Sequence, residues 1–446
     1  MMSQAFYTGL SGLRSNAQAI DVVTDNLSNV STVGYRGYTT EFSSMYQKAI
    51  NTDASITSVA NGIGVGSEVG GVVMDQAQGV FQLTDSATDL AILGDGWFGV
   101  EGNGQTMYTR DGSFTFDENR DLVTQDGFFV LGTMGNNIAN NVLTEPLSEI
   151  ALANVSEQEK LSFPTELYFP PIASTEVTFL GNLSLTEEQI KQDTAALADI
   201  AANALDPNHK ITLPRAALSV SSTVINADGV KNNLRLEFSK VDPQVAPGSQ
   251  WNVKATVQSR DGAEVFSTEN GLVTFEELGA LTSNSLNTID NQGSPVAINM
   301  GVGFDGIISI DTDSTLSSSS DGEEDGTLVG YEIEKNGSVL ATFTNGKQSA
   351  VGSIGIFHFQ NDQGLERVSG SKFSESANSG KAIFFQDENG NNINGTGLVT
   401  SKLEGSNVRM EAGLTDLIIY QRAYDSSSKL ITTADEMLQK ALSMGA

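Results

Sequence analysis

The chain has 446 residues, which is enough for several domains with ample hydrophobic core. Its 24 Lys and Arg residues face 55 Asp and Glu residues, a formal net charge of −31, which argues against a surface that binds nucleic acid or other phosphates. The chain has no cysteine, which excludes disulfides and thiolate metal sites, and its only histidines are His209 and His358. The 45 Gly residues favour β-rich domains with many tight turns.

Residues 3–30 predict an amphipathic helix, with Ser3 as a candidate N-cap. Apolar side chains recur along it at alternating gaps of three and four, with Thr24 in the one missing slot. This 3.5-residue period indicates a narrow seam that faces another helix. The seam residues are Phe6, Leu10, Leu13, Ala17, Ile20 and Leu27.

Beyond this helix, Gly34 and Gly37 end the helical period. Residues 47–71 are polar and rich in glycine, so we expect a semi-extended connector there.

Two separated stretches, 72–145 and 327–404, share short apolar runs divided by turn dipeptides, and we expect them to form one inner β domain. Predicted hairpin turns are Asp95-Gly96, Asp111-Gly112, Asp126-Gly127, Asn336-Gly337 and Asn345-Gly346. In the predicted strand 354–361, we expect His358 to face solvent or a polar partner.

The stretch between them, 146–326, predicts an inserted outer domain that is mainly β. It contains strand patterns at 176–185 and 232–241 and an alanine-rich helix at 187–205. Residues 311–326 are acidic and of low complexity, so we expect an exposed loop.

The C-terminal residues predict a second long helix with the same 3.5-residue period. Gly413 and the lack of a capping residue predict a start near Leu414, giving about 28 residues and a length of about 40 Å. A helix this long needs a partner helix, either the N-terminal helix or a second copy, although amphipathic ends can also simply cover a globular core. Its seam residues are Leu417, Tyr420, Tyr424, Ser427, Ile431, Ala434, Leu438 and Ala441.

The expected fold class is therefore α+β, with long terminal helices forming a coiled-coil-like core domain and nested, mainly β inner and outer domains. The expected division is 1–46 with 405–446 as the helical core, 47–71 as the connector, 72–145 with 327–404 as the inner domain, and 146–326 as the outer domain.

No pattern in the sequence predicts a catalytic, cofactor or metal site. The loops that begin at Asp117 and Asp387 start like calcium loops but lack the glycine and the glutamate at the required positions. The glycines at 62, 64 and 66 are not followed by the lysine of a phosphate loop. These absences favour a structural protein, although an ion-binding loop stays an open alternative.

The sequence also lacks a secretory signal pattern and any apolar run of eighteen residues. The residues alone therefore predict a cytoplasmic protein, or one exported by a machine that does not cleave its signal, with no membrane insertion.

Four motifs resemble those of the flagellar rod, hook and hook-associated axial proteins. The first fits the family pattern N-x-A-N-x-x-T-x-G-[FY]-[KR], with Ser28 where alanine is usual. The blocks 88–102 and 108–117 resemble two inner-domain motifs, and 405–438 is similar to the C-terminal motif, although Arg409, Glu411 and Gly413 depart from the usual residues. The matching motif residues are Asn26, Asn29, Thr32, Gly34, Tyr35, Arg36, Gln421, Arg422 and Ala423.

Length, the β-rich insertion and residues 176–183 favour the hook members of this family over the shorter distal rod members. The resemblance implies a non-enzymatic homopolymer outside the cell, a curved tube that acts as a universal joint and transmits torque from rod to filament. It also implies contacts with the rod, the hook–filament junction proteins, the hook cap and the type III export apparatus, with export that leaves no cleaved signal. A different class, a secreted acidic β-rich adhesin or carbohydrate-active protein, is the alternative, suggested by the unmatched 146–326.

Overall fold

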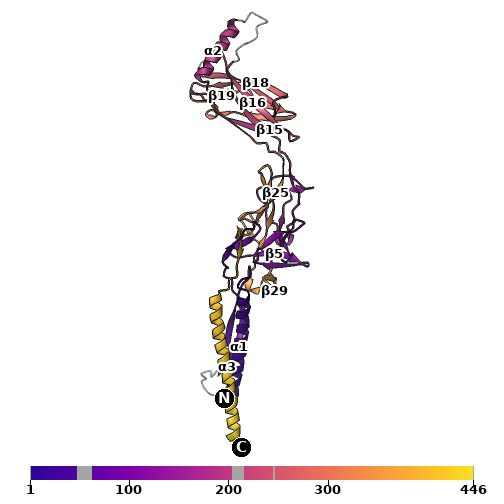
Figure 1. Ribbon diagram of the computed structural model, residues 1–446, viewed down its shortest axis with the longest axis vertical. Coiled ribbons are helices and arrows are strands. Elements are labelled where there is room, and N and C mark those ends of the chain that lie inside the picture. The colour runs from indigo at the N-terminus through magenta and orange to yellow at the C-terminus, as the bar shows by residue number, and fades with distance from the viewer. Residues whose placement is uncertain (1, 48–62, 203–214, 245–246, 445–446) are drawn as a thin grey trace.

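The computed structural model describes residues 2–47, 63–202, 215–244 and 247–444. The molecule is elongated (Figure 1). A helical stem occupies one end, an inner β domain lies in the middle, and an outer β domain forms the other end.

The stem consists of two long helices and a β hairpin. Helix α1 (Met2–Ser28) lies beside helix α3 (Met410–Met444), as Figure 1 shows, and the antiparallel strands β1 (Tyr38–Gln47) and β2 (Ile63–Met74) also pack on α1. The two helical ends of the chain therefore pack on each other, although they are separated by nearly the whole sequence.

Two predicted helix starts are wrong. Helix α3 begins at Met410 rather than near Leu414, and the backbone N–H of Gly413 donates to the carbonyl of Arg409 over 3.0 Å, so the glycine is accommodated within the first turns. Helix α1 includes Ser3 within its bounds, so Ser3 is not its N-cap.

The predicted connector is also partly wrong. Its residues 63–71 belong to strand β2, which pairs with β1 with register shifts after Glu41 and Met45. Pairing with β1 forms a strand here despite the many glycines. Gly66 (φ +120°) lies directly against the Ser11 side chain of α1, where a β-carbon would not fit. The rest of the predicted connector, 48–62, lies outside the described residues.

The inner β domain is built on a 15-stranded sheet that combines early and late parts of the chain. Its main path runs β10 (Ile138–Ala139), β11 (Val142–Leu143), β13 (Tyr168–Phe169), β25 (Gly326–Ile333), β26 (Ser338–Phe343), β27 (Gln348–Ile354), β9 (Phe129–Met134), β5 (Trp97–Gly102), β6 (Gln105–Thr109), β30 (Lys372–Ser374) and β29 (Glu366–Ser369). Off this path lie β7 (Phe114–Phe116), β8 (Leu122–Thr124), β12 (Glu159–Lys160) and β28 (Ile356–Phe357). Three short pairs complete the domain: β3 (Phe81–Leu83) with β34 (Lys402–Glu404), β4 (Leu90–Leu93) with β33 (Gly397–Thr400), and β31 (Phe385–Gln386) with β32 (Asn392–Ile393). The 3₁₀ turns are η1 (Val155–Glu157) and η2 (Asp362–Gly364).

The predicted start of the outer domain at 146 differs from the structure. Strands β12 and β13 lie in the inner sheet, and Leu161, Phe163 and Phe169 lie in its core. The chain leaves for the outer domain only after residue 171, because these apolar side chains are buried among the inner strands.

The turn predictions had mixed outcomes. Gly337 and Gly346 adopt positive φ (+91° and +78°) in the β25–β26 and β26–β27 hairpins, as expected for Asn-Gly turns. Asp111-Gly112 is not a hairpin turn, because β6 pairs with β5 and β30, and β7 pairs with β8. His358 is buried and has a polar partner: its Nε2 lies 2.7 Å from the carbonyl oxygen of Asn394, and burial lowers its pKa.

The outer β domain has two sheets around one core. The first contains β14 (Glu176–Asn182), β20 (Thr288–Asn291), β21 (Ser294–Asn299), β22 (Gly301–Val302), β23 (Asp305–Ile308) and β24 (Thr315–Ser320). The second contains β15 (Leu218–Ile225), β16 (Lys231–Lys240), β17 (Ser249–Ser259), β18 (Val265–Phe275) and β19 (Leu281–Asn284). Side chains of both sheets, including Phe179, Phe238 and Trp251, form a single buried cluster.

Two local predictions for the outer domain can be compared with the structure. Helix α2 (Glu187–Ala202) confirms the predicted helix up to the limit of the described residues. The predicted loop 311–326 is wrong in part, because 315–320 form β24, antiparallel to β14 from Asn182↔Thr315 to Val177↔Ser320. Backbone pairing therefore overrides the loop-like composition.

Two chain segments that run side by side, 170–175 and 321–325, join the outer domain to the inner one; we call them the neck. Ile172 and Glu323 each donate a backbone N–H to the other's carbonyl over 2.9 Å. Lys347 of the inner domain forms an ion pair with Glu323 at 2.5 Å, and Asn345 donates to the Glu324 carbonyl over 2.7 Å. The neck is thus held to the inner domain by side chains next to one short antiparallel contact.

Within the described residues, no helix is long and apolar enough to cross a membrane. The same part of the chain holds no group of three or more His, Cys, Asp or Glu side chains placed to bind a metal ion.

Candidate functional site

Small residues make the contact between α1 and α3. A β-carbon on Gly9 would lie 3.0 Å from Ile431 Cγ1 and 3.2 Å from the Ser427 carbonyl oxygen, and one on Gly12 would lie 2.8 Å from Ser427 Oγ. Ala19 and Val23 are also buried on α1. The two backbones therefore approach closely because side chains are missing at the contact.

The predicted seam of α3 lies largely within the stem. Ala434 is buried, while Leu438 is 40% exposed. The Tyr420 ring lies 5.8 Å from the Phe42 ring of β1, so this seam contacts the hairpin as well as α1. The half-buried members are Leu417, Tyr420, Tyr424, Ser427 and Ile431.

The predicted seam of α1 is only half covered. Phe6 is 38% exposed, and Leu27 packs against Gly413, whose β-carbon position lies 3.0 Å from Leu27 Cδ2. The remaining members are half-buried: Leu10, Leu13, Ala17 and Ile20. This stripe, which we call the α1 strip, lies beside the α3 contact rather than in its centre.

A second stripe with heptad spacing runs along α3, next to the predicted seam. Its members are separated by alternating gaps of four and three, and its large side chains are exposed: Ile419 (54%), Leu430 (52%) and Met437 (54%). At 3.6 residues per turn it lies about 100° around the helix from the predicted seam of α3, which we call the first seam. We call it the second seam: Ile419, Ala423, Ser426, Leu430, Thr433 and Met437.

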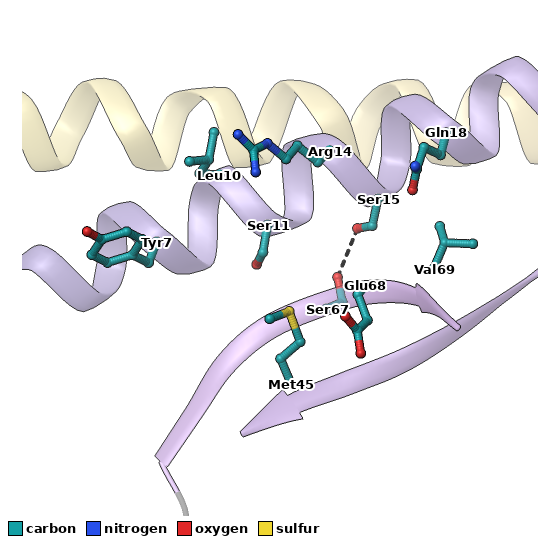
Figure 2. Close-up of a pocket in the computed structure, with 10 residues that line it drawn as sticks. All are labelled: Tyr7, Leu10, Ser11, Arg14, Ser15, Gln18, Met45, Ser67, Glu68 and Val69. Carbon is teal, nitrogen blue, oxygen red and sulfur yellow. Dashed lines mark hydrogen bonds between the residues drawn. The ribbon is translucent and has the colours of Figure 1, made fainter. Parts of the chain in front are cut away.

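A cleft of about 760 Å³ lies between α1 and the β1–β2 hairpin (Figure 2). Leu10 and Arg14 line it from α1, and Met45 and Val69 line it from the hairpin. The Oγ atoms of Ser15 and Ser67 lie 3.0 Å apart and join the two sides. The cleft belongs to the same stem surface as the α1 strip, since Leu10 is part of both.

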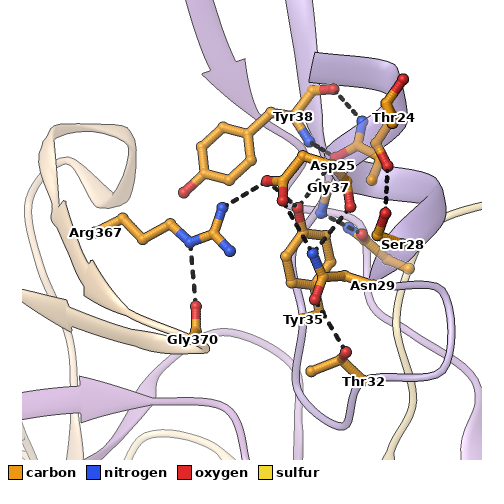
Figure 3. A network of polar contacts seen from close by, with 12 residues as sticks. Thr24, Asp25, Ser28, Asn29, Thr32, Tyr35, Gly37, Tyr38, Arg367 and Gly370 are labelled. Carbon is orange, nitrogen blue, oxygen red and sulfur yellow. Dashed lines mark hydrogen bonds and ion pairs between the residues drawn. The ribbon is translucent and has the colours of Figure 1, made fainter. Parts of the chain in front are cut away.

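The first family motif folds the chain back after α1 (Figure 3). The Asn26 amide accepts from the Tyr38 N–H over 2.9 Å and donates to the Tyr38 carbonyl over 2.7 Å. Asn29 donates to the Asp25 carbonyl over 2.9 Å, and Thr32 donates to Asn29 Oδ1 over 3.1 Å. The Asn26 amide thus ties the end of α1 to the start of β1, and the Asn29 and Thr32 side chains close the turn between them.

A cation from the inner domain reaches this turn. Arg367 Nη1 lies 2.8 Å from Asp25 Oδ2, and the guanidinium lies over the rings of Tyr35 and Tyr38 at 5.2 and 5.8 Å (Figure 3). The Tyr35 hydroxyl donates to the same carboxylate over 3.1 Å. Burial and the Asp25 charge raise the pKa of Tyr35 to about 12, so this hydroxyl stays a donor at neutral pH.

Gly34 is required by a close backbone approach. It has φ +66°, and a β-carbon there would lie 2.4 Å from the backbone nitrogen of Asp111. Its N–H donates to the Glu404 carbonyl over 2.7 Å. One glycine thus brings together the segments before β1, after β6 and before α3.

Arg36 and Arg110 share the carboxylate of Glu404. Arg36 Nη2 lies 3.0 Å from Oε1 and Arg110 Nη1 lies 3.3 Å from Oε2, and the exposed fractions of the three side chains are 4%, 3% and 2%. Glu404 also accepts from the Gly79 N–H over 2.9 Å, and Arg110 lies over the Trp97 ring at 5.5 Å. Burial and the neighbouring Arg36 lower the pKa of Arg110 to about 10. We call Arg36, Arg110 and Glu404 the junction triad.

The C-terminal motif residues lie on two faces of α3. Gln421 and Arg422 are exposed, and Ala423 is half-buried and belongs to the second seam. None of the three is a member of the seam that faces α1.

Sequence reasoning missed several of these residues. Glu404 is one of 55 acidic residues, so only the structure distinguishes it. Gly9 and Gly12 sit about a turn apart inside a helical pattern, where glycine is unfavourable, and that cost was a usable sign of close helix packing.

Three family models match this chain. They are the flagella basal body rod protein over residues 6–36, the flagellar hook protein FlgE/F/G D1 domain over 91–166, and the flagellar basal body rod FlgEFG protein C-terminal region over 399–444. The second match ends at 166, which agrees with the position of β12 in the inner sheet.

Relatives match over nearly the whole chain. The flagellar hook protein FlgE of Brucella suis is 30% identical over 97% of this chain and 96% of its own length. That of Borreliella burgdorferi is 27% identical over 98% of this chain and 99% of its own length. The crystal structure of Helicobacter pylori flagellar hook protein FlgE2 shares the fold, with a TM-score of 0.52 at 18% identity over 72% of this chain and 99% of that one. This chain therefore belongs to the flagellar hook protein family.

Proposed function

We propose that this chain is a structural subunit of the flagellar hook and polymerises through its helical stem. The observation that carries the proposal is the exposed second seam of α3, with Ile419, Leu430 and Met437 each more than half exposed along a heptad stripe. A single chain leaves this apolar stripe in water, so burying it against another copy lowers the free energy.

The other half of such a contact is the α1 strip. It has the same 3.5-residue period, is only half covered within the chain, and includes Phe6 and Leu10. The smaller residues of the second seam, Ala423, Ser426 and Thr433, lie between its large ones and leave room for large side chains of a facing helix.

A contact between two different surfaces repeats from copy to copy. Such a heterologous contact closes into a ring or continues as a helix, which is the geometry of a tube. The elongated shape in Figure 1 would place the stems at the tube axis and the outer β domains at its surface. The compliance that a universal joint needs would then arise between neighbouring outer domains.

In the proposed location, outside the cell, the tube would meet the rod at one end and the hook–filament junction proteins at the other, with a cap during growth. The absence of cysteine is compatible with export of an unfolded chain through a type III apparatus, since no disulfide has to form or break.

The experiment is negative-stain electron microscopy of the purified full chain at low and high salt. High salt screens the repulsion expected from a net charge of −31, so we expect curved tubes at high salt and fewer at low salt. Straight tubes would favour a rod subunit, and a chain that stays monomeric under all salt conditions would contradict the proposal.

A further inference from the structure

The junction triad joins three parts of the chain that lie far apart in the sequence. Arg36 stands between α1 and β1, Glu404 ends β34 shortly before α3, and Arg110 follows β6 in the inner domain. The turn of the stem between α1 and β1 and the segment that leads into α3 therefore meet the inner domain at one carboxylate.

The contacts around the triad fix the relative orientation of the segments they join as well as the distance between them. The Glu404 carboxylate accepts from both guanidinium groups and from the Gly79 N–H, and Arg36 Nη1 also donates to the Ala77 carbonyl. Guanidinium groups present their donors in a planar fork, so each bond restricts orientation. A purely apolar contact of the same area would tolerate rotation.

A second side chain ties the same segments together. The Asn407 Oδ1 accepts from the Gly37 N–H over 2.7 Å, and its Nδ2 donates to the carbonyls of Asp75 and Ala77 over 2.9 Å. The start of α3 is thus bonded to both ends of the β1–β2 hairpin segment.

Burial makes the triad sensitive to loss of one partner. With all three side chains at most 4% exposed, removing the carboxylate leaves two cations without their counter-charge in a site that water does not reach. Replacing all three by apolar side chains avoids that penalty but removes the directional bonds.

We propose that Arg36, Arg110 and Glu404 are positioning residues whose buried ion cluster sets the direction of the stem relative to the inner β domain. The direction of the stem decides where the second seam and the α1 strip are presented to a neighbouring copy. The inference concerns the single chain, so it can be tested separately from the polymerisation proposed above.

The test measures that direction in the monomer. The chain has no cysteine, so Glu118→Cys in the inner domain and Asp425→Cys on α3, both exposed, give two unique spin-label positions. Electron–electron double resonance at low salt then gives the distribution of distances between the labels. We expect one narrow distance peak, and a peak at least twofold broader after Glu404→Gln.

The matched control is Asp121→Asn, which removes a buried carboxylate paired with Lys160 at 3.1 Å entirely within the inner domain. It costs stability but should leave the peak narrow. An equally narrow peak for Glu404→Gln would overturn the inference, as would equal broadening by both variants.

If Glu404→Gln fails to fold by circular dichroism, the combined variant Arg36→Met, Glu404→Leu and Arg110→Met gives the same measurement without an unpaired buried charge. A broad peak supports the inference and a narrow one overturns it.

Discussion

The stem and the outer β domain bury their apolar residues in opposite ways. In the outer domain a core of large side chains lies inside, with Phe179, Phe238 and Trp251 at most 1% exposed. In the stem, small residues such as Ala19 are inside, and large ones such as Ile419 and Leu430 are about half exposed. The outer domain therefore has a large core of its own, whereas the stem leaves an apolar stripe that we propose neighbouring copies cover.

Removal of residues 414–446 should have the largest effect. The two β domains keep their own cores and should stay folded, while tubes should be lost completely because both seams of α3 are gone. Circular dichroism and electron microscopy of the truncated chain check both halves, and tubes of normal length would refute the role of the stem.

A charge in the second seam should weaken assembly without unfolding the chain. Leu430→Asp places a carboxylate on a surface that is exposed in the monomer, so we expect the protein concentration needed for polymerisation to rise at least tenfold, or about 1.4 kcal/mol per contact. Sedimentation at high salt measures this concentration.

The control for that variant is Thr432→Asp, which adds the same charge at an exposed position of α3 outside both seams. If both variants assemble equally poorly, charge alone is responsible and the second seam is not an interface.

Charges in the first seam should act differently. Ile431 contacts the Gly9 position of α1, so Ile431→Asp should lower the thermal stability of the stem within the monomer as well as prevent assembly. The same combined effect is expected at Leu417 and Tyr424, and a weaker effect on the monomer at Leu438, which is 40% exposed. Amide hydrogen exchange of the monomer separates the two seams.

A core substitution in the outer domain should destabilise that domain without preventing assembly. Trp251→Ala removes a side chain that is 1% exposed and should cost about 3–5 kcal/mol of outer-domain stability. Tubes should still form, since the stem is unchanged. Calorimetry and microscopy of the same sample test this, and a loss of tubes with the outer domain still folded would contradict it.

The smallest expected effect concerns pH in the outer domain. Arg215 donates Nε and Nη2 to the two carboxylate oxygens of Asp193 over 2.9 Å, and this bonding holds the pKa of Asp193 below its usual value. A depressed folded-state pKa adds stability above the unfolded pKa of about 4, and that stability is lost as pH falls through the folded value. Urea unfolding followed through Trp251 in a Trp97→Phe background should show a shallower acid dependence for Asp193→Asn.

The long-range periodic features could be predicted from the sequence, and the close contacts could not. A 3.5-residue period over many turns indicated both terminal helices, because their large apolar residues repeat regularly. The α1–α3 contact depends on Gly9 and Gly12, which such a pattern ignores. Strand β24 is mostly serine, and it is ordered by its backbone pairing with β14, a contact distant in the sequence that local composition does not record.

The same limit applies to the candidate site, whose motif residues were predicted without their contacts. The resemblance pointed to Gly34 and Arg36 as motif residues, but not to their physical roles. Those roles depend on Asp111 and Glu404, which meet them only in the folded chain.

The neck also determines how freely the outer domain can be exchanged. The chain enters and leaves that domain at Ile172 and Glu323, which are hydrogen-bonded to each other as an antiparallel pair, so their Cα atoms lie about 5.5 Å apart. We therefore expect that a compact module whose own ends lie that close can replace the outer domain without changing the path of the inner sheet. Residues 173–322 are in this sense an inserted unit that can be exchanged while the stem and the inner domain stay the same.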